Sequence, residues 1–150
     1  MNESWDIVSI IALIISAGTL AFYIFELRFN LRRAKKESTL NAYKQLQNHF
    51  KYIKTITGRI PELEKKDEEW AELTECLADI ENFCVGVNTG VYDINILNRV
   101  GGDYFIYLFH LLGPIIEKKR SKKSKRRPYD EFEKTVDKLI AIRTKQNLVD

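Results

Sequence analysis

Residues 7 to 25, IVSIIALIISAGTLAFYIF, form an uncharged and strongly apolar stretch of nineteen residues. As an α-helix, a stretch of this length can cross a hydrocarbon core of about 30 Å. Eleven of its residues are Ile, Leu, Val or Phe, which together favour insertion into a bilayer by about 3 to 6 kcal/mol. The stretch therefore predicts a transmembrane helix over residues 7–26.

A cleaved signal peptide is the alternative interpretation. Signal peptides begin with a positively charged region, contain an apolar segment of about 7 to 15 residues and end at a small-residue cleavage site. Here no basic residue precedes the stretch, the apolar segment is longer, and no clear cleavage site follows it. A retained membrane anchor is therefore expected.

The charges that flank the stretch predict its orientation. Glu3 and Asp6 precede it, and five basic residues follow it, namely Arg28, Arg32, Arg33, Lys35 and Lys36. Basic residues beside a membrane helix stay on the cytoplasmic side. Residues 1–6 are thus expected outside the cytoplasm, and residues 27–150 are expected to form a cytoplasmic domain.

Small and polar residues form a stripe along the anchor. Ser9, Ala12, Ser16 and Thr19 are spaced by three, four and three residues, which places them on one face of a helix. Such stripes let membrane helices pack closely and share hydroxyl hydrogen bonds, although a monomeric anchor also tolerates them. Together with the heptad-like pattern that follows, the stripe favours a homo-oligomer within the lipid bilayer.

The remaining residues show helical periodicity, with no strand-like alternation to compete with it. A first apolar face comprises Leu40, Tyr43, Leu46, Phe50, Ile53 and Ile56. Ser38 or Thr39 could cap a separate helix there, which leaves open whether the anchor continues into this segment. A second amphipathic helix carries nine acidic residues between Glu62 and Glu81, together with apolar residues at Trp70, Leu73, Leu77, Ile80 and Cys84. The predicted fold class is all-α, with a bundle of about four to five helices after the anchor.

The stretch CVGVNTGVYD, residues 84 to 93, is expected to end the second helix in a tight corner. Gly90 suits the left-handed position after a last helical turn, and Val91 is expected to fold back onto the preceding apolar residues. Gly86 lets another backbone approach the helix closely. A phosphate-binding loop is disfavoured, because no Lys-Ser or Lys-Thr pair follows these glycines.

Polar residues gather just after the corner. Asp93 is placed to cap a short helix over residues 94–100, which Gly101-Gly102 would end. The densest polar cluster comprises Asp93, Asn98, Arg99 and Asp103. An Arg-carboxylate pair in this cluster is expected to brace the helix junction rather than to catalyse a reaction.

Residues 103 to 116, DYFIYLFHLLGPII, are apolar almost all round and too few to span a bilayer, so they predict a buried core helix. Gly113-Pro114 should bend or interrupt this helix. His110, within it, is expected to be a satisfied core histidine. Pro128 can open a final helix, which carries Phe132, Val136, Leu139, Ile140 and Arg143.

A basic segment joins these last two helices. Eight of the ten residues from 118 to 127 are basic, namely Lys118, Lys119, Arg120, Lys122, Lys123, Lys125, Arg126 and Arg127. The segment can be a solvated loop, lie against anionic lipid, hold nucleic acid phosphates, or pair with the acidic second helix of the same or a neighbouring subunit. No aromatic residue interrupts the run to stack on bases. Membrane or intersubunit contact is therefore favoured over nucleic acid, and removal of these charges is expected to leave the fold intact.

No pattern in the chain indicates an enzyme. The histidines at 49 and 110 and the cysteines at 76 and 84 lack the spacing of metal ligands, and no common nucleophile or phosphate motif occurs. Helical nucleases of the HEPN type carry an Arg four to six residues before a His, and neither histidine has one. The cysteines are expected to be small buried hydrophobic residues in a reducing compartment. No catalytic residue, metal or cofactor is predicted.

The segments TLNAYKQLQ, ENFCVGVNTGVYDINILNRVGG, GPIIEKKR and PYDEFEKTVDKLI, after a membrane helix, resemble the bacterial family called domain of unknown function 4760. The resemblance covers nearly the whole chain and implies a location in the bacterial inner membrane, without an established activity. The layout is also similar, more loosely, to the small HEPN-like membrane protein that accompanies the type VI-B CRISPR nuclease. That similarity implies a ring-shaped pore assembly in defence against phage. The alternative is a membrane-tethered adaptor that holds nucleic acid or anionic lipid through its basic segment.

Overall fold

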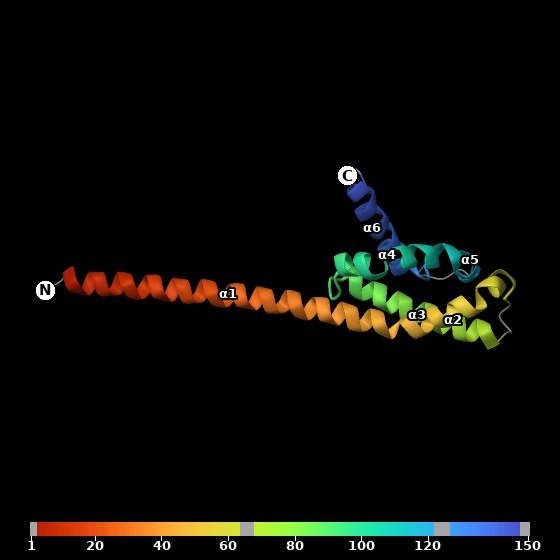
Figure 1. Ribbon diagram of the computed structural model, residues 1–150, viewed down its shortest axis with the longest axis horizontal. Coiled ribbons are helices and arrows are strands. Elements are labelled where there is room, and N and C mark those ends of the chain that lie inside the picture. The colour runs from red at the N-terminus through yellow and green to blue at the C-terminus, as the bar shows by residue number, and fades with distance from the viewer. Residues whose placement is uncertain (1–2, 64–67, 122–126, 148–150) are drawn as a thin grey trace. The chain divides into compact units, whose positions relative to one another are not determined.

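A computed structural model describes residues 3–63, 68–121 and 127–147, and the chain forms two compact units, Met1–Lys35 and Lys36–Asp150. Its helices are α1 (Glu3–Gln45), α2 (Gln47–Ile56), the 3-10 helix η1 (Thr57–Glu62), α3 (Glu68–Asn88), α4 (Ile94–Leu111), α5 (Gly113–Arg120) and α6 (Asp130–Asn147) (Figure 1). No strand occurs in these described ranges. The predicted all-α fold is confirmed.

The first apolar face of the second unit extends over two helices, because α1 ends at Gln45 and α2 begins at Gln47. The break falls at the buried Leu46, and neither Ser38 nor Thr39 begins a helix. Thr39 has a different role. Its hydroxyl is fully buried and accepts a hydrogen bond of 2.8 Å from the backbone N–H of Asp93. It therefore satisfies the backbone of a corner more than fifty residues away in the sequence.

The core of the second unit contains a cluster of aromatic rings around Phe105. Both α3 and α4 pack against α6 (Figure 1). The fully buried ring of Phe105, on α4, lies near Phe83 of α3 and Phe132 of α6. The centre of that ring is 5.6 to 6.3 Å from the ring centres of four others, namely Tyr43, Phe50, Phe83 and Phe132. The apolar positions expected of the second amphipathic helix are also buried, at Trp70, Leu73, Leu77, Ile80 and Cys84.

The corner after α3 contains the left-handed glycine that the sequence predicts. Gly90 has a φ of 82°, and its N–H donates to the carbonyl of Val87 over 3.2 Å. The prediction for Val91 is wrong, because 59% of its surface is exposed. Tyr92 folds back instead: its N–H donates to the carbonyl of Gly86, and its ring stacks on Phe83 at 5.1 Å.

The glycine at 86 therefore accommodates a side chain rather than a second backbone. A Cβ atom built at Gly86 would overlap the ring of Tyr92. Gly101 has the same function, since a Cβ atom there would overlap the side chain of Tyr43. Two close helix contacts in this unit thus depend on the absence of a side chain.

Helix α4 begins as predicted and is interrupted where predicted. The carboxylate of Asp93 accepts a hydrogen bond of 2.8 Å from the N–H of Asn95 and caps the helix. The predicted break at Gly101-Gly102 is confirmed: the backbone of Gly101 is not helical, and two helical segments meet there across a kink, the second of which runs to Leu111. The interruption predicted at Gly113-Pro114 is confirmed, because α5 begins there with Pro in its first turn.

One further prediction in this part of the chain is wrong. His110 is exposed on α4 and is not a core residue. The apolar segment that the sequence predicts to be buried on all sides therefore has one face in solvent. On α6, Phe132, Val136 and Leu139 are buried, whereas 42% of the surface of Ile140 is exposed.

The brace at the α4 junction uses a different arginine from the one predicted. Arg99 is exposed, and no ion pair joins it to a described residue. Arg143 of α6 pairs with the carboxylate of Asp103 and donates to the side-chain and backbone oxygens of Asn98 over 2.8 and 3.1 Å. The brace therefore ties α4 to α6, a connection that proximity in the sequence does not indicate.

Candidate functional site

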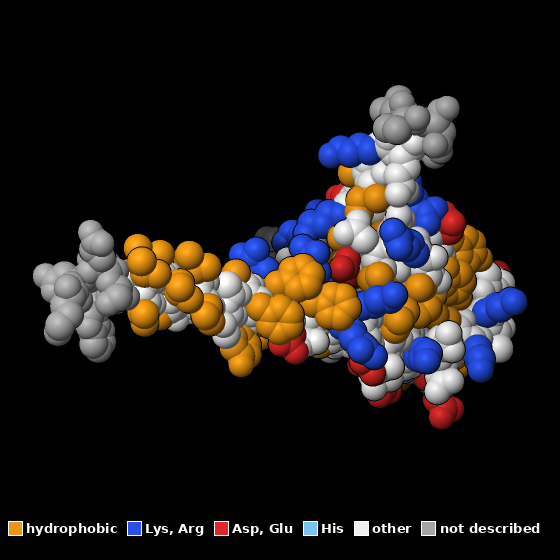
Figure 2. Space-filling view, turned by 60° about the vertical axis from the view of Figure 1, so that its left-hand side comes forward, with side chains coloured by type: hydrophobic (Ala, Val, Ile, Leu, Met, Phe, Trp, Pro, Cys, Tyr) orange, Lys and Arg blue, Asp and Glu red, His pale blue; other side chains and the backbone are white. Residues whose placement is uncertain are grey.

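The apolar side chains of α1 in the first unit are exposed along the whole anchor segment. Among the large apolar residues between Ile7 and Leu31, the exposed fraction of the surface runs from 45% at Ile24 to 72% at Leu13. Figure 2 shows these side chains gathered over the helix. Within the described residues this is the one helix long and apolar enough to cross a membrane.

The stripe of small residues lies on this exposed helix. Ser9, Ala12, Ser16 and Thr19 are all exposed. The hydroxyl of Ser16 donates to the carbonyl of Ala12, and that of Thr19 donates to the carbonyl of Ile15, each over 2.8 Å. These two hydroxyl protons are thus satisfied within the helix. A neighbouring helix would meet only small side chains and hydroxyl oxygens that can accept hydrogen bonds.

The basic segment is divided between residues that serve the fold and residues outside the described ranges. Lys122, Lys123, Lys125 and Arg126 lie outside the described residues. Arg120 donates to the carbonyls of Pro128 and Tyr129 over 3.0 and 3.3 Å, and its side chain is only 10% exposed. Arg120 and Arg127 both pair with Glu133 of α6, at 2.9 and 3.0 Å.

The two lysines at the start of the segment lie against α3. The ammonium of Lys118 donates to the carbonyl of Leu63 over 3.1 Å, and that of Lys119 lies 5.4 Å from the ring centre of Trp70. The interpretation of the whole segment as a solvated loop therefore does not hold for Arg120. That arginine belongs to the folded domain, and its removal is expected to cost stability.

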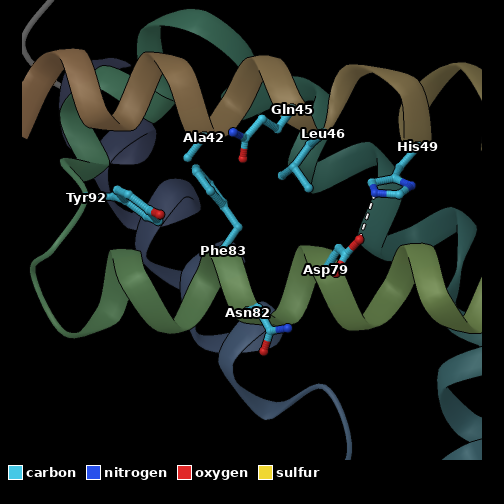
Figure 3. Close-up of a pocket in the computed structure, with 8 residues that line it drawn as sticks. All are labelled: Ala42, Gln45, Leu46, His49, Asp79, Asn82, Phe83 and Tyr92. Carbon is cyan, nitrogen blue, oxygen red and sulfur yellow. Dashed lines mark ion pairs between the residues drawn. The ribbon is translucent and has the colours of Figure 1, made fainter.

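A polar pocket of about 280 Å³ opens between the last turn of α1, α2 and α3 (Figure 3). It is lined by Ala42, Gln45, Leu46, His49, Asp79, Asn82, Phe83 and Tyr92. All of these residues belong to the second unit. The volume is close to the lower end of the range for small-molecule sites, about 300 to 1,000 Å³.

A histidine at one end of the pocket connects a thiol to a carboxylate. The Nδ1 atom of His49 lies 3.2 Å from the sulfur of Cys76, and its Nε2 atom lies 2.8 Å from a carboxylate oxygen of Asp79. Burial raises the pKa of the Cys76 thiol to about 11, and the carboxylates of Glu72 and Asp79 act in the same direction. The thiol is therefore protonated at neutral pH and can donate to Nδ1.

This donation sets the tautomer of the imidazole. With Nδ1 accepting from the Cys76 thiol, the ring proton lies on Nε2 and donates to Asp79. The order of the three side chains is that of a cysteine hydrolase, but the chemistry is not, because a nucleophilic cysteine needs a lowered thiol pKa. The arrangement is suited to hold Asp79 in place.

Two amide side chains on the same pocket have no internal partner. Neither Gln45 nor Asn82 makes a side-chain hydrogen bond to another described residue. In Figure 3 His49 and Asp79 lie at one end of the pocket and Tyr92 lies at the other, with Gln45 and Asn82 between them. No group of three His, Cys, Asp or Glu side chains suited to a metal ion occurs in the described part of the chain.

Sequence reasoning missed this pocket because its polar residues come from separate helices. His49 and Asp79 are thirty positions apart, and neither belongs to a motif. One signal was available: His49 and Cys76 each lie beside an apolar stripe, next to Phe50 and Leu77 respectively. Polar groups at the edges of two stripes that pack together are candidates to contact each other.

The comparison with protein families gives a match over most of the chain. A family model described as Domain of unknown function (DUF4760) matches residues 7–139, which include the apolar helix and every residue of the pocket. No curated protein and no solved structure matches the chain. The chain belongs to the DUF4760 family.

Proposed function

We propose that this protein is a single-pass protein of the bacterial inner membrane whose cytoplasmic helical domain self-associates. The observation that carries the proposal is the exposed apolar surface between Ile7 and Leu31. An apolar surface of this extent is unfavourable in water, so lipid or neighbouring copies of the helix are its natural surroundings. The acidic residues before the helix and the basic residues after it support an N-terminus outside and a domain inside.

Self-association is supported by the stripe of Ser9, Ala12, Ser16 and Thr19. Because the hydroxyls of Ser16 and Thr19 donate to their own helix, these residues enter the bilayer at a reduced polar cost. Their small size then allows a second helix to approach closely, which is the main source of stability between membrane helices. The proposal includes no enzymatic step.

An oligomer of such helices is also the arrangement of a pore-type effector. The support for that form of the proposal is the similarity to the CRISPR-associated membrane protein and the small-residue stripe. Expression of a pore would be toxic and would let a membrane-impermeant dye enter the cell. Toxicity without dye entry would count against a pore while leaving self-association standing.

Mass photometry of the full chain in detergent tests the oligomer directly. The parent protein is expected to run as a multiple of its mass, and Ala12→Leu with Ser16→Leu is expected to shift it toward the monomer. Gly18→Leu is the matched control, because Gly18 lies on the opposite face of the helix and has open space around it. A monomeric parent would contradict the proposal, as would equal disruption by Gly18→Leu.

A membrane-tethered adaptor is the second candidate, and the basic segment is its basis. The pairing of Arg120 and Arg127 with Glu133 reduces the number of charges available to a ligand. Binding of RNA or of anionic liposomes that weakens steeply with salt would favour the adaptor. Salt-dependent oligomer size without nucleic acid would instead point to contact between subunits.

A further inference from the structure

The pocket between α1, α2 and α3 is lined by polar and aromatic side chains. Asp79 lies with His49 at one end, and Gln45 and Asn82 lie between that end and Tyr92 (Figure 3). One oxygen of Asp79 accepts from His49, and no described residue hydrogen-bonds to the other. The rings of Phe83 and Tyr92 stack at 5.1 Å with an interplanar angle of 19°.

The charge around the pocket is negative. None of its lining residues is Lys or Arg, and the exposed carboxylates of Glu72 and Glu75 lie on the same helix as Asp79. The Nε2 atom of His49 lies 2.8 Å from only one of the two oxygens of the Asp79 carboxylate. A phosphate or carboxylate ligand would be repelled here, and a cation would be attracted.

We propose that this pocket binds a small organic cation that carries a guanidinium or primary ammonium group. The free oxygen of Asp79 accepts a charge-assisted hydrogen bond from the cation, and the carbonyls of Gln45 and Asn82 accept further N–H groups. The two aromatic rings accommodate the aliphatic part of the ligand and add cation–π attraction. A metal ion is disfavoured, because the pocket supplies only two side chains, His49 and Asp79, of the types that usually bind metals.

Two sources can supply this chemistry, a free metabolite or the arginine side chain of a peptide. Isothermal titration calorimetry on the full chain in non-ionic detergent distinguishes them, with agmatine as the free cation and N-acetyl-argininamide as the peptide mimic. At low ionic strength the tighter of the two is expected to bind with a Kd of about 1 mM or below. Tighter binding of agmatine assigns a free cation, and tighter binding of the peptide mimic assigns a protein side chain.

The test variant is Asp79→Asn, which keeps the shape of the side chain and an oxygen for His49. It is expected to weaken binding by at least about tenfold, the value of one charge-assisted hydrogen bond. Glu75→Gln is the matched control, because it removes the same charge from the same helix at an exposed residue outside the pocket. It is expected to change the Kd less than about twofold.

A second variant separates binding from folding. Asn82→Ala removes a side chain that is exposed and has no internal hydrogen bond, so the fold is expected to survive while agmatine binding weakens. The proposal is overturned if neither cation binds at about 10 mM, or if Asp79→Asn and Glu75→Gln weaken binding equally. Tighter binding of adenosine monophosphate than of agmatine would also overturn it.

Discussion

The hydroxyl of Thr39 accepts the backbone N–H of Asp93 over 2.8 Å, and this bond joins the end of α1 to the corner between α3 and α4. Thr39 is fully buried and Asp93 is half-buried. A buried N–H that loses its acceptor keeps the full cost of desolvation. One of the contacts that stabilise the corner therefore comes from a side chain that lies far from it in the sequence.

Thr39→Val is expected to lower the free energy of unfolding by about 1 to 3 kcal/mol, because it leaves the N–H of Asp93 without an acceptor while preserving volume. Thr39→Ser keeps the hydroxyl and is the control, with a smaller loss from the missing methyl group. Urea unfolding of the full chain in detergent, followed by circular dichroism, measures both. Equal stability of the Val variant and the parent would show that the bond contributes nothing.

Gly90 provides a test of backbone conformation. Its φ of 82° is unfavourable for any residue with a side chain, although no atom would contact an added Cβ there. Gly90→Ala is therefore expected to cost about 1 kcal/mol through strain alone. Gly113 also has open space around it, and its φ does not lie in the left-handed region.

Gly113→Ala is thus the matched control for Gly90→Ala. It lies at the start of α5, where Ala is expected to be neutral or slightly stabilising. The midpoints of urea unfolding of the two variants should shift in opposite directions, or only the Gly90 variant should shift. A Gly113 variant that is the less stable of the two would contradict the conformational explanation.

The first turn of α6 provides a pH test. The ammonium of Lys134 lies 2.7 Å from a carboxylate oxygen of Asp130 and 2.8 Å from one of Glu131. Hydrogen bonds from Lys134 lower the pKa of both carboxyl groups. A carboxyl group whose pKa is lower in the folded state stabilises the fold above its unfolded pKa, and this contribution is lost as the pH falls through the folded pKa.

The parent protein is therefore expected to lose stability between about pH 5 and pH 3, and Lys134→Met is expected to lose less over that interval. The effect should be small, because all three side chains are partly solvated. Lys145→Met is the control on the same helix, since Lys145 is exposed and joins no ion pair with a described residue. Parallel pH profiles for the parent and the Lys134 variant would contradict the assignment.

The elements of the fold were predictable where the evidence is local. The apolar stripe through Trp70, Leu73 and Leu77 predicts α3, and the glycine at 90 predicts the end of that helix, because both depend on neighbours in the sequence. The break at Gly101 was also predictable, because a glycine pair interrupts helical backbone locally. The sequence does not indicate that the side chain of Tyr43 packs against Gly101.

The candidate sites were also predictable only where they depend on neighbouring residues in the sequence. The anchor follows from one local stretch of sequence, whereas the pocket requires three helices to bring Gln45 of α1, His49 of α2 and Asp79 of α3 together. The arginine of the brace was assigned to position 99 because of its proximity in the sequence, although Arg143 occupies that role. Arg143 continues an apolar stripe on α6, and an arginine in such a position indicates a partner on the helix that it faces.

The basic segment leads to the last prediction, because Arg120 is part of the fold. It donates to the carbonyls of Pro128 and Tyr129 and to the carboxylate of Glu133, and Tyr129 has a φ of 60°, a conformation that is strained for a residue with a side chain. The guanidinium thus holds the turn that leads into α6. Arg120→Ala is expected to lower the free energy of unfolding by about 2 to 3 kcal/mol.

Lys119→Ala is the matched control, because it removes the adjacent charge and only a contact with the Trp70 ring, with an expected loss below about 1 kcal/mol. Arg120→Lys should fall between the two variants, since an ammonium cannot reproduce the planar fork of donors that reaches three oxygens. Urea unfolding of the full chain measures all three. If Arg120→Ala proved as stable as Lys119→Ala, the guanidinium would be free for a ligand, and the case for a binding role of the basic segment would be strengthened.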